Sequence, residues 1–400
     1  MKTLIDNGIL LTPTERIEGG WLLVEGGRIA SLGRGKPPAA DSSVDAAGRF
    51  VAPGFIDLHA QGFRGYDLWD PSDEGFLRAT RQMAATGVTA GQASVDATPE
   101  VCRIMRPRIG RADGGCRLLG LYFETPFISP AKRGAIPLDR VQPPSMELAR
   151  EILEWSKGIL SMITMAPEQP GALELVRLFR RTPGPCGPVV VALGHTSATF
   201  DQATAGLAAG MTHCTHLYNA MPTLHHREPG PVGALLARPD VSVELVCDGI
   251  HLHPAAVRVA VACKGAAKAC LITDCVSARD RDTSSGVPRL PDGTIAGSIL
   301  SMDRAVANVQ HFAGLALPQA VEMATLSPAR VLGCDKSKGS LAPGRDADLV
   351  LFDADVNVSM TMIGGDVVWQ TPGPAVVVHV RRVACQPVIE CAVLPSCVAV

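Results

Sequence analysis

The chain has 400 residues, with 37 basic and 39 acidic side chains and a formal net charge of −2. This length exceeds that of one small core and suits a large barrel with an accessory domain, and the near-zero charge gives no reason to expect a nucleic acid or an anionic membrane as partner. No run approaches the roughly 18 apolar residues of a membrane span, and Met1–Leu11 lack the pattern of a cleaved signal peptide, so we expect a cytoplasmic location.

Short alternating stretches, such as Leu22–Glu25 and Arg28–Leu32, occupy the first 49 residues between Gly-Gly turns. Alternation bounded by glycine turns is typical of β-strands. The stretch Ala347–Asp353 near the other end has the same character and follows the turn Ala342–Arg345. We therefore expect small strands at both ends. To the tail beyond about Gln370, which either adds a strand or stays disordered, we assign no function.

Between these ends, apolar runs of strand length alternate with alanine-rich helical patterns. Val189–Leu193, Val241–Val246 and Ala269–Thr273 are runs of the first kind, and Phe200–Ala209 and Pro254–Ala262 are patterns of the second. This alternation is the signature of βα units around a parallel sheet. We therefore predict an α/β fold with a (β/α)8 TIM-like barrel.

Five polar residues stand just past a hydrophobic run, where such a barrel carries its catalytic groups: Glu124, His195, His216, His251 and Asp274. The first three supply one carboxylate and two imidazoles and leave a coordination position open for water, as catalytic zinc sites do. Taken singly, a histidine after a strand is more often structural; the surrounding motifs favour ligands. A bound metal lowers the pKa of water from about 15.7 toward about 7. We expect one divalent ion per chain, zinc by default, although iron, cobalt or manganese would fit similar ligands.

A set of motifs resembles the N-acetylglucosamine-6-phosphate deacetylases, a branch of the amidohydrolase superfamily, from about Ala52 to about Asp353. The motifs are PGFIDLHAQG at Pro53–Gly62, LYFETPFISPAKRGA at Leu121–Ala135, GHTSATFDQATAGLAAG at Gly194–Gly210, THLYNAMPTLHHREPGPVGALL at Thr215–Leu236, VCDGIHLHP at Val246–Pro254, LITD at Leu271–Asp274 and AGSILSM at Ala296–Met302. The resemblance implies that both chain ends meet in one small β-sandwich, formed by residues 1–49 and 340–400, beside a barrel over residues 50–339.

Many amidohydrolases hold a second metal with a His-x-His pair after the first barrel strand, and this chain reads His59-Ala60-Gln61 there. A neutral amide is a poor zinc ligand compared with imidazole. We therefore expect the second site to be weak, with His59 as a weak ligand or as a substrate-side hydrogen-bond partner. The family normally has glycine where this chain has Thr125, and a β-branched residue could crowd that loop.

The resemblance also assigns roles around the substrate. Asp274 is the general acid/base, which takes a proton from the attacking water and returns it to the departing amine. His251 orients the amide carbonyl or a sugar hydroxyl. Arg227 binds the phosphate, because a guanidinium suits bidentate phosphate contacts, and in the resembling enzymes it comes from the neighbouring subunit, which implies a homodimer. The other expected substrate contacts are Ala135, Asn219, Ala220, Ile299, Leu300, Ser301 and Met302.

The function expected from this resemblance is the metal-dependent deacetylation of N-acetylglucosamine 6-phosphate, a small amino-sugar phosphate, to glucosamine 6-phosphate and acetate. The same chemistry on N-acetylgalactosamine 6-phosphate stays open, because one inverted hydroxyl is invisible in these motifs. A catalytically impaired paralogue that binds sugar phosphates is a further alternative. It is suggested by Thr125, Gln61, the altered polar segment Ser277–Ser285 after Asp274, and the unusual tail.

Overall fold

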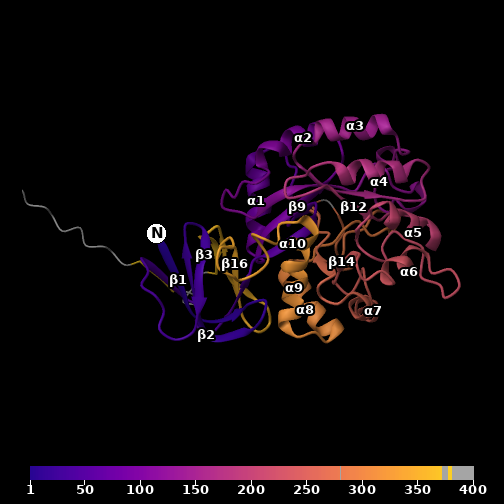
Figure 1. Ribbon diagram of the computed structural model, residues 1–400. Coiled ribbons are helices and arrows are strands. Elements are labelled where there is room, and N and C mark those ends of the chain that lie inside the picture. The colour runs from indigo at the N-terminus through magenta and orange to yellow at the C-terminus, as the bar shows by residue number, and fades with distance from the viewer. Residues whose placement is uncertain (280, 372–376, 381–400) are drawn as a thin grey trace, which may run out of the picture.

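The computed structural model of the chain describes residues 1–279, 281–371 and 377–380. Within these ranges the chain forms an eight-stranded parallel barrel with helices around it, and a separate sheet made from both ends of the chain, whose indigo and yellow strands lie side by side in Figure 1. This confirms the predicted α/β barrel with an accessory unit. No helix in the described ranges is long and apolar enough to span a membrane.

The barrel strands follow one another around the sheet in chain order, and every neighbouring pair is parallel. Nearly all their residues are buried, because helices cover the outer face and side chains of other strands fill the interior. The strands are β6 (Phe55–Ala60), β9 (Val88–Val95), β10 (Arg117–Phe123), β11 (Leu160–Met165), β12 (Val190–Leu193), β13 (His213–Cys214), β14 (Ser242–Val246) and β15 (Ala269–Ile272).

The barrel closes where β15 meets β6, through contacts near the carboxyl ends of both strands. The Asp274 amide donates to the His59 carbonyl (2.8 Å), and the Gln61 amide donates to the Cys275 carbonyl (2.8 Å). A side-chain contact joins the same seam: the hydroxyl of Thr273 donates to the buried carboxylate of Asp57 (2.6 Å). Closure therefore brings together two residues, at positions 59 and 274, that the sequence singled out.

The helices pack outside the barrel, and several begin at a side-chain cap. At α5, Thr199 and Gln202 exchange hydrogen bonds with each other's main-chain amides (3.2 and 2.9 Å) and form a capping box. The predicted helices at 200–209 and 254–262 are both present, the second two residues longer. The helices are α1 (Asp73–Ala84), α2 (Pro99–Met105), α3 (Met146–Trp155), α4 (Ala172–Arg181), α5 (Phe200–Ala209), α6 (Gly230–Leu236), α7 (Pro254–Lys264), α8 (Met302–Ala313), α9 (Leu317–Ala324) and α10 (Leu326–Leu332), with 3-10 turns at Arg106–Arg108, Pro130–Lys132 and Leu138–Arg140.

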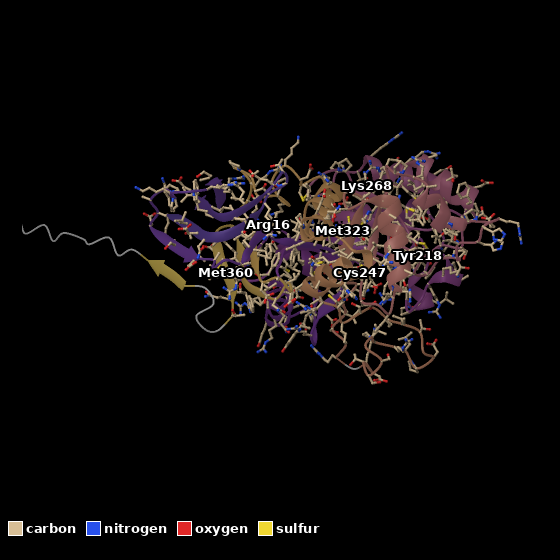
Figure 2. The ribbon with its side chains drawn as sticks, turned by 90° about the horizontal axis from the view of Figure 1, so that it is seen from below. Arg16, Tyr218, Cys247, Lys268, Met323 and Met360 are labelled. Carbon is tan, nitrogen blue, oxygen red and sulfur yellow. The ribbon has the colours of Figure 1, made fainter. Side chains whose placement is uncertain are left out.

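The accessory unit is one nine-stranded sheet, here called the chain-end sheet, with a hydrophobic core of its own that includes Ile5, Leu22 and Met360. In Figure 2, Arg16 and Met360 lie on this side of the molecule, and Tyr218 and Lys268 lie on the barrel side. Its strands are β1 (Lys2–Leu11), β2 (Arg16–Glu25), β3 (Arg28–Gly33), β4 (Ser42–Asp45), β5 (Phe50–Pro53), β16 (Leu349–Phe352), β17 (Val358–Ile363), β18 (Asp366–Gln370) and β19 (Val377–Val380), and a small separate hairpin is formed by β7 (Gly62–Phe63) and β8 (Tyr66–Asp67).

Two details of this sheet differ from, or add to, the expected division of the chain. β5 pairs with β1 and β16, so residues 50–53 lie in the chain-end sheet although the expected boundary put them in the barrel. In the tail, β19 pairs with β4 and adds a strand. The remaining tail residues, 372–376 and 381–400, lie outside the described ranges.

Candidate metal centre and active site

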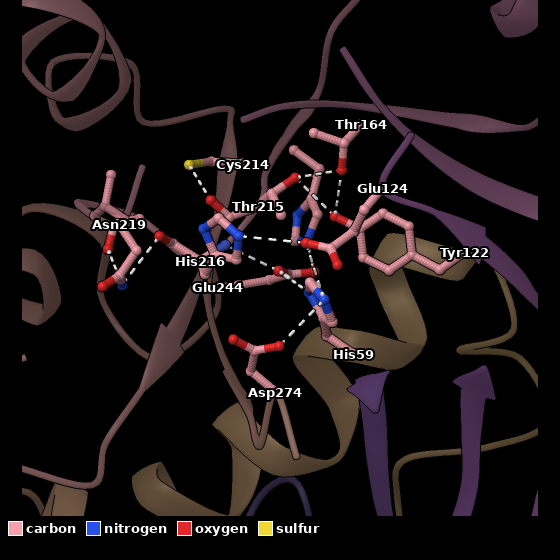
Figure 3. Close-up of polar contacts among 12 residues, drawn as sticks. His59, Tyr122, Glu124, Thr164, Cys214, Thr215, His216, Asn219, Glu244 and Asp274 are labelled. Carbon is pink, nitrogen blue, oxygen red and sulfur yellow. Dashed lines mark hydrogen bonds and ion pairs between the residues drawn. The ribbon is translucent and has the colours of Figure 1, made fainter. Parts of the chain in front are cut away.

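The polar residues picked out by their place after apolar runs do meet at one mouth of the barrel. Glu124 directly follows β10, and His195 and His216 lie two residues past β12 and β13. Asp274 lies two residues past β15 on the same side, and the close-up shows Glu124, His216 and Asp274 converging (Figure 3). The strands of a (β/α)8 barrel are all parallel, so residues at their carboxyl ends share one face.

The three expected ligands, here called the metal centre, have the spacing of a metal site. Oε1 of Glu124 lies 3.3 Å from Nε2 of His195 and 3.3 Å from Nε2 of His216, and the two nitrogens are 3.0 Å apart. Ligands about 2.0–2.1 Å from a tetrahedral zinc ion would lie about 3.3–3.4 Å from one another. When both nitrogens are unprotonated, as metal ligands must be, their lone pairs would repel at this distance, and a cation between them removes that repulsion. The donor set and its spacing therefore fit one divalent ion.

Neighbouring groups orient these ligands. Nδ1 of His195 lies 2.8 Å from the Lys132 carbonyl, so it carries the proton and Nε2 is left free for a metal. Nε2 of Gln61 donates to Oε2 of Glu124 (3.2 Å), which keeps Oε1 toward the histidines. Gln61 therefore supports a ligand of the metal centre. Nδ1 of His216 is buried without a hydrogen-bond partner in the described part of the chain.

The backbone at this mouth is strained. His195 (φ 45°), His216 (φ 24°), Ala220 (φ 51°) and Asp274 (φ 50°) all have positive φ values that non-glycine residues rarely adopt. Such residues cost on the order of 1–3 kcal/mol each and persist only where the surrounding structure enforces them. Their concentration at these strand ends is a mark of a functional constraint.

The charges of the site are set by burial and by three carboxylates around His59. Burial raises the pKa of Asp274, and the nearby Glu124 charge adds to that rise, whereas His59 opposes it. For Glu124 burial also acts to raise the pKa, but the charge of His59 and the close side-chain contacts of His195, His216 and His59 outweigh it and hold the pKa well below its usual range. Glu124 is thus held ionised, as a metal ligand must be, and Asp274 retains affinity for a proton, as an acid/base group must.

His59 contacts carboxylates on both sides. Its ring is completely buried, with Nδ1 3.1 Å from Oε2 of Glu244 and Nε2 3.3 Å from Oε1 of Glu124 and 3.5 Å from Oδ1 of Asp274. The ring lies behind these groups and does not line the open cavity. This position supports a role beside the metal centre more than a direct contact with substrate.

A cavity of about 690 Å³ opens onto the metal centre and Asp274. Of the expected substrate contacts, Ala135, Asn219, Ala220 and His251 line it. Nδ1 of His251 lies 2.6 Å from the Asp248 carboxylate, which holds the ring in place.

The other expected substrate contacts lie elsewhere. Arg227 is exposed outside the cavity of its own chain, with Nη1 2.8 Å from Nε2 of His226. Ile299 is half exposed, whereas Leu300, Ser301 and Met302 are buried and Met302 opens α8. For these residues a contact with substrate stays a prediction.

The altered loops take part in the cavity wall. Thr125 is buried there and donates to Asp96 (3.4 Å), so its branched side chain is accommodated without displacing Glu124. In the loop after β15, Arg281 reaches the cavity and donates to the Ala296 carbonyl (2.8 Å). It forms no ion pair with any residue of the described ranges. Arg140 also lines the cavity but is paired with Asp96 (3.3 Å).

Sequence reasoning missed two buried acids, Asp57 and Glu244, which lie inside barrel strands β6 and β14. A signal was present, because a carboxylate within an apolar strand run is costly to bury unless it has partners. Burial acts to raise the pKa of Glu244, but the charge of His59 and hydrogen bonds from His213 and His59 lower it to about 2.

The chain matches the Amidohydrolase family over residues 50–368. It is 31% identical to the N-acetylglucosamine-6-phosphate deacetylase of Bacillus subtilis (strain 168), over 91% of this chain and 96% of that one. It is 32% identical to the N-acetylgalactosamine-6-phosphate deacetylase of Escherichia coli O157:H7, over 89% and 96%. A solved structure of a mutant N-acetyl-D-glucosamine-6-phosphate deacetylase from Mycobacterium smegmatis, in complex with N-acetyl-D-glucosamine-6-phosphate, superposes with a TM-score of 0.81 at 33% identity, covering 92% of this chain and 99% of that chain.

Strand order, metal-centre geometry and these similarities over nine-tenths of the chain agree. The chain belongs to the amidohydrolase family, in the branch of the N-acetylglucosamine-6-phosphate deacetylases.

Proposed function

We propose that this protein hydrolyses the acetamide bond of N-acetylglucosamine 6-phosphate and releases glucosamine 6-phosphate and acetate. The observation that carries the proposal is the convergence of Glu124, His195 and His216, with atoms 3.0–3.3 Å apart, beside a buried Asp274 at the floor of an open cavity. That arrangement suits hydrolysis by an activated water. The similarity to characterised deacetylases supports the choice of substrate.

In the proposed mechanism each residue has a separate task. Glu124, His195 and His216 would hold a divalent ion, zinc by default, which supplies Lewis acidity and lowers the pKa of water toward about 7. Asp274 accepts a proton from the water that attacks the acyl carbon. It returns that proton to the amide nitrogen as the carbon–nitrogen bond breaks, so that acetate and the amine leave. His251, held by Asp248, orients the substrate from the cavity wall.

The chain as a whole carries almost no net charge, so the phosphate group of the substrate has to be bound by donors and cations within the site itself. Asn219 and Ala220 line the cavity, where the main-chain amide of Ala220 would donate to a phosphate oxygen, whereas the side-chain amide of Asn219 donates to the carbonyls of His216 (3.2 Å) and Leu217 (3.3 Å). Arg281 supplies a guanidinium within the same chain. Arg227 lies outside that cavity, so a contact between it and the phosphate would require that it come from a neighbouring subunit in a homodimer. The homodimer otherwise rests on the family resemblance, and the cytoplasmic location stays an expectation from the sequence.

The galactosamine epimer is the second candidate substrate, favoured by the similarity to a named N-acetylgalactosamine-6-phosphate deacetylase. The site residues described above do not distinguish the two epimers. An impaired paralogue is less well supported, because all three ligands and the acid/base group are present with suitable spacing and Thr125 is accommodated.

Acetate release by the purified zinc-loaded protein, measured with the two 6-phosphate epimers and with unphosphorylated N-acetylglucosamine, tests the proposal. We expect the largest kcat/KM for N-acetylglucosamine 6-phosphate and none above background for a His195→Ala control. A larger kcat/KM for the galactosamine epimer would reverse the choice of substrate. Release of no acetate from any of the three by a folded, zinc-containing protein would reject the deacetylase function.

A further inference from the structure

A fully buried carboxylate on β14, Glu244, connects the metal centre to the barrel interior (Figure 3). Its Oε2 accepts the main-chain amide of His216 (3.0 Å) and lies 3.1 Å from Nδ1 of His59. Its Oε1 lies 3.1 Å from Nε2 of His213. The proposed mechanism assigns no chemical step to Glu244, and its side chain does not line the cavity.

Glu244 holds the chain at a metal ligand by two independent bonds. Besides the side-chain bond to the His216 amide, its main-chain carbonyl accepts the amide of Leu217 (2.9 Å). These bonds clamp the segment in which His216 takes its strained, positive φ of 24°. Because the direction of an imidazole follows from its backbone, the side-chain bond helps to aim Nε2 of His216 at the metal centre.

The same oxygen sets the orientation of His59. A donated Nδ1–H bond to Oε2 fixes one edge of the ring, and the opposite edge, Nε2, then faces Glu124 and Asp274 at 3.3 and 3.5 Å. The ring cannot turn to solvent, because it is completely buried. Glu244 thus orients two imidazoles of the site at once.

The side chain of Glu244 is itself held in place by His213. His213 presents Nε2 to Oε1 of Glu244, while its Nδ1 lies 2.7 Å from the Ser242 hydroxyl. A buried carboxylate with fewer partners would carry a large desolvation cost. The three N–H partners offset that cost and leave the carboxylate one orientation.

We infer that Glu244 is a positioning residue for the metal centre, whose hydrogen bonds to His216 and His59 strengthen divalent metal binding. The inference rests on the metal site of the proposed function but not on its substrate. Partners of this kind in other metalloproteins contribute about 10–100-fold to metal affinity.

The test is a titration of the metal-free, full-length protein with Co²⁺, followed by its visible absorption, beside the melting temperature of each variant. Glu244→Leu removes the acceptors and should weaken Co²⁺ binding by about 10–100-fold. Glu244→Gln should bind within about threefold of the unmodified protein, because the amide oxygen can accept from both His216 and His59 while its NH2 faces His213. Ser161→Ala is the control, because it removes the buried hydrogen bonds of the Ser161 hydroxyl with the Leu121 carbonyl and with Gln92 in the barrel without touching the site, and it should leave affinity unchanged.

Unchanged Co²⁺ affinity and spectrum in a folded Glu244→Leu variant would overturn the inference, and so would an equal loss in Glu244→Leu and Glu244→Gln. If Glu244→Leu does not fold, His213→Leu takes its place; it frees Oε1 and should weaken binding by at least about threefold, and unchanged affinity would overturn the inference. These results do not depend on acetate release. A protein that binds Co²⁺ as expected but releases no acetate refutes the deacetylase proposal alone.

Discussion

The pH dependence of folding stability should carry the signature of one buried acid at the barrel seam. Asp57 is completely buried on β6, and its oxygens accept the hydroxyl of Thr273 (2.6 Å) and the main-chain amides of Thr273 (3.3 Å) and His59 (3.2 Å). Burial raises the pKa of Asp57 from its ordinary 3.8 to about 6, despite these hydrogen bonds, which act to lower it.

The size and sign of the effect follow from that pKa. The difference between about 6 and 3.8 corresponds to about 3 kcal/mol. The folded chain holds this proton more tightly than the unfolded chain does. Below about pH 4 both states are protonated at Asp57, so this acid contributes no difference. As the pH rises to about 6 the unfolded chain loses the proton first, and the free energy of unfolding falls by about 3 kcal/mol, a loss that persists at higher pH.

Asp57→Asn should remove this component while keeping the seam. The amide oxygen of asparagine can accept the two main-chain N–H groups, and its NH2 can face the Thr273 hydroxyl, which can accept. The measurement is urea unfolding of both proteins from pH 4 to pH 7.5. The free energy of unfolding of the variant, relative to the unmodified protein, should rise by up to about 3 kcal/mol across that range.

The contributions of the other titrating groups to the free energy of unfolding cancel in this difference, because those groups are the same in both proteins. Thr361→Val is a suitable control, since it removes a buried hydroxyl bonded to the Ala84 carbonyl (2.7 Å) and introduces no titrating group. Its stability should differ from that of the unmodified protein by the same amount at every pH. If the curves for Asp57→Asn and the unmodified protein run parallel, Asp57 does not fold with a raised pKa and the reasoning is refuted.

Three further predictions concern the site. His195→Ala should lose both tightly bound metal and activity, as measured by elemental analysis after dialysis and by acetate release; full metal content would show that the ligand assignment is wrong. Asp274→Asn should keep its metal while kcat falls by at least about 10²-fold, and a near-normal kcat would move the acid/base role elsewhere. Arg227→Ala and Arg281→Ala should each raise KM for the 6-phosphate more than for the unphosphorylated sugar. Arg279→Ala is the control and should not, because Arg279 lies on the same loop as Arg281 but donates to the Gly65 carbonyl outside the cavity. Equal effects of all three variants would exclude specific phosphate contacts.

Much of the site could be predicted because its key residues have a local signature. Glu124, His195, His216 and Asp274 each follow an apolar run, and a run of that length predicts a strand whose carboxyl end lies at the mouth of a parallel barrel. The helix at 200–209 was likewise predictable from its alanine-rich pattern, and Thr199 caps it. The expected boundary at residue 49 was less exact, because the pairing of β5 with β1 and β16 is not visible in its own four residues.

The sequence by itself thus determined the class of barrel and the strand ends at which the expected ligands and acid/base group lie, since each depends on residues close together in the chain. Only the tertiary structure decided which groups support them. Gln61 bonds to Glu124 across 63 residues of chain, and the bond from Thr273 to Asp57 spans 216. The partners of Glu244 come from two other strands: His59 from β6, and His213 and His216 from β13 and the segment just after it. Such contacts exist only once the barrel has closed, because closure, and no local preference, places distant strand ends within hydrogen-bond distance.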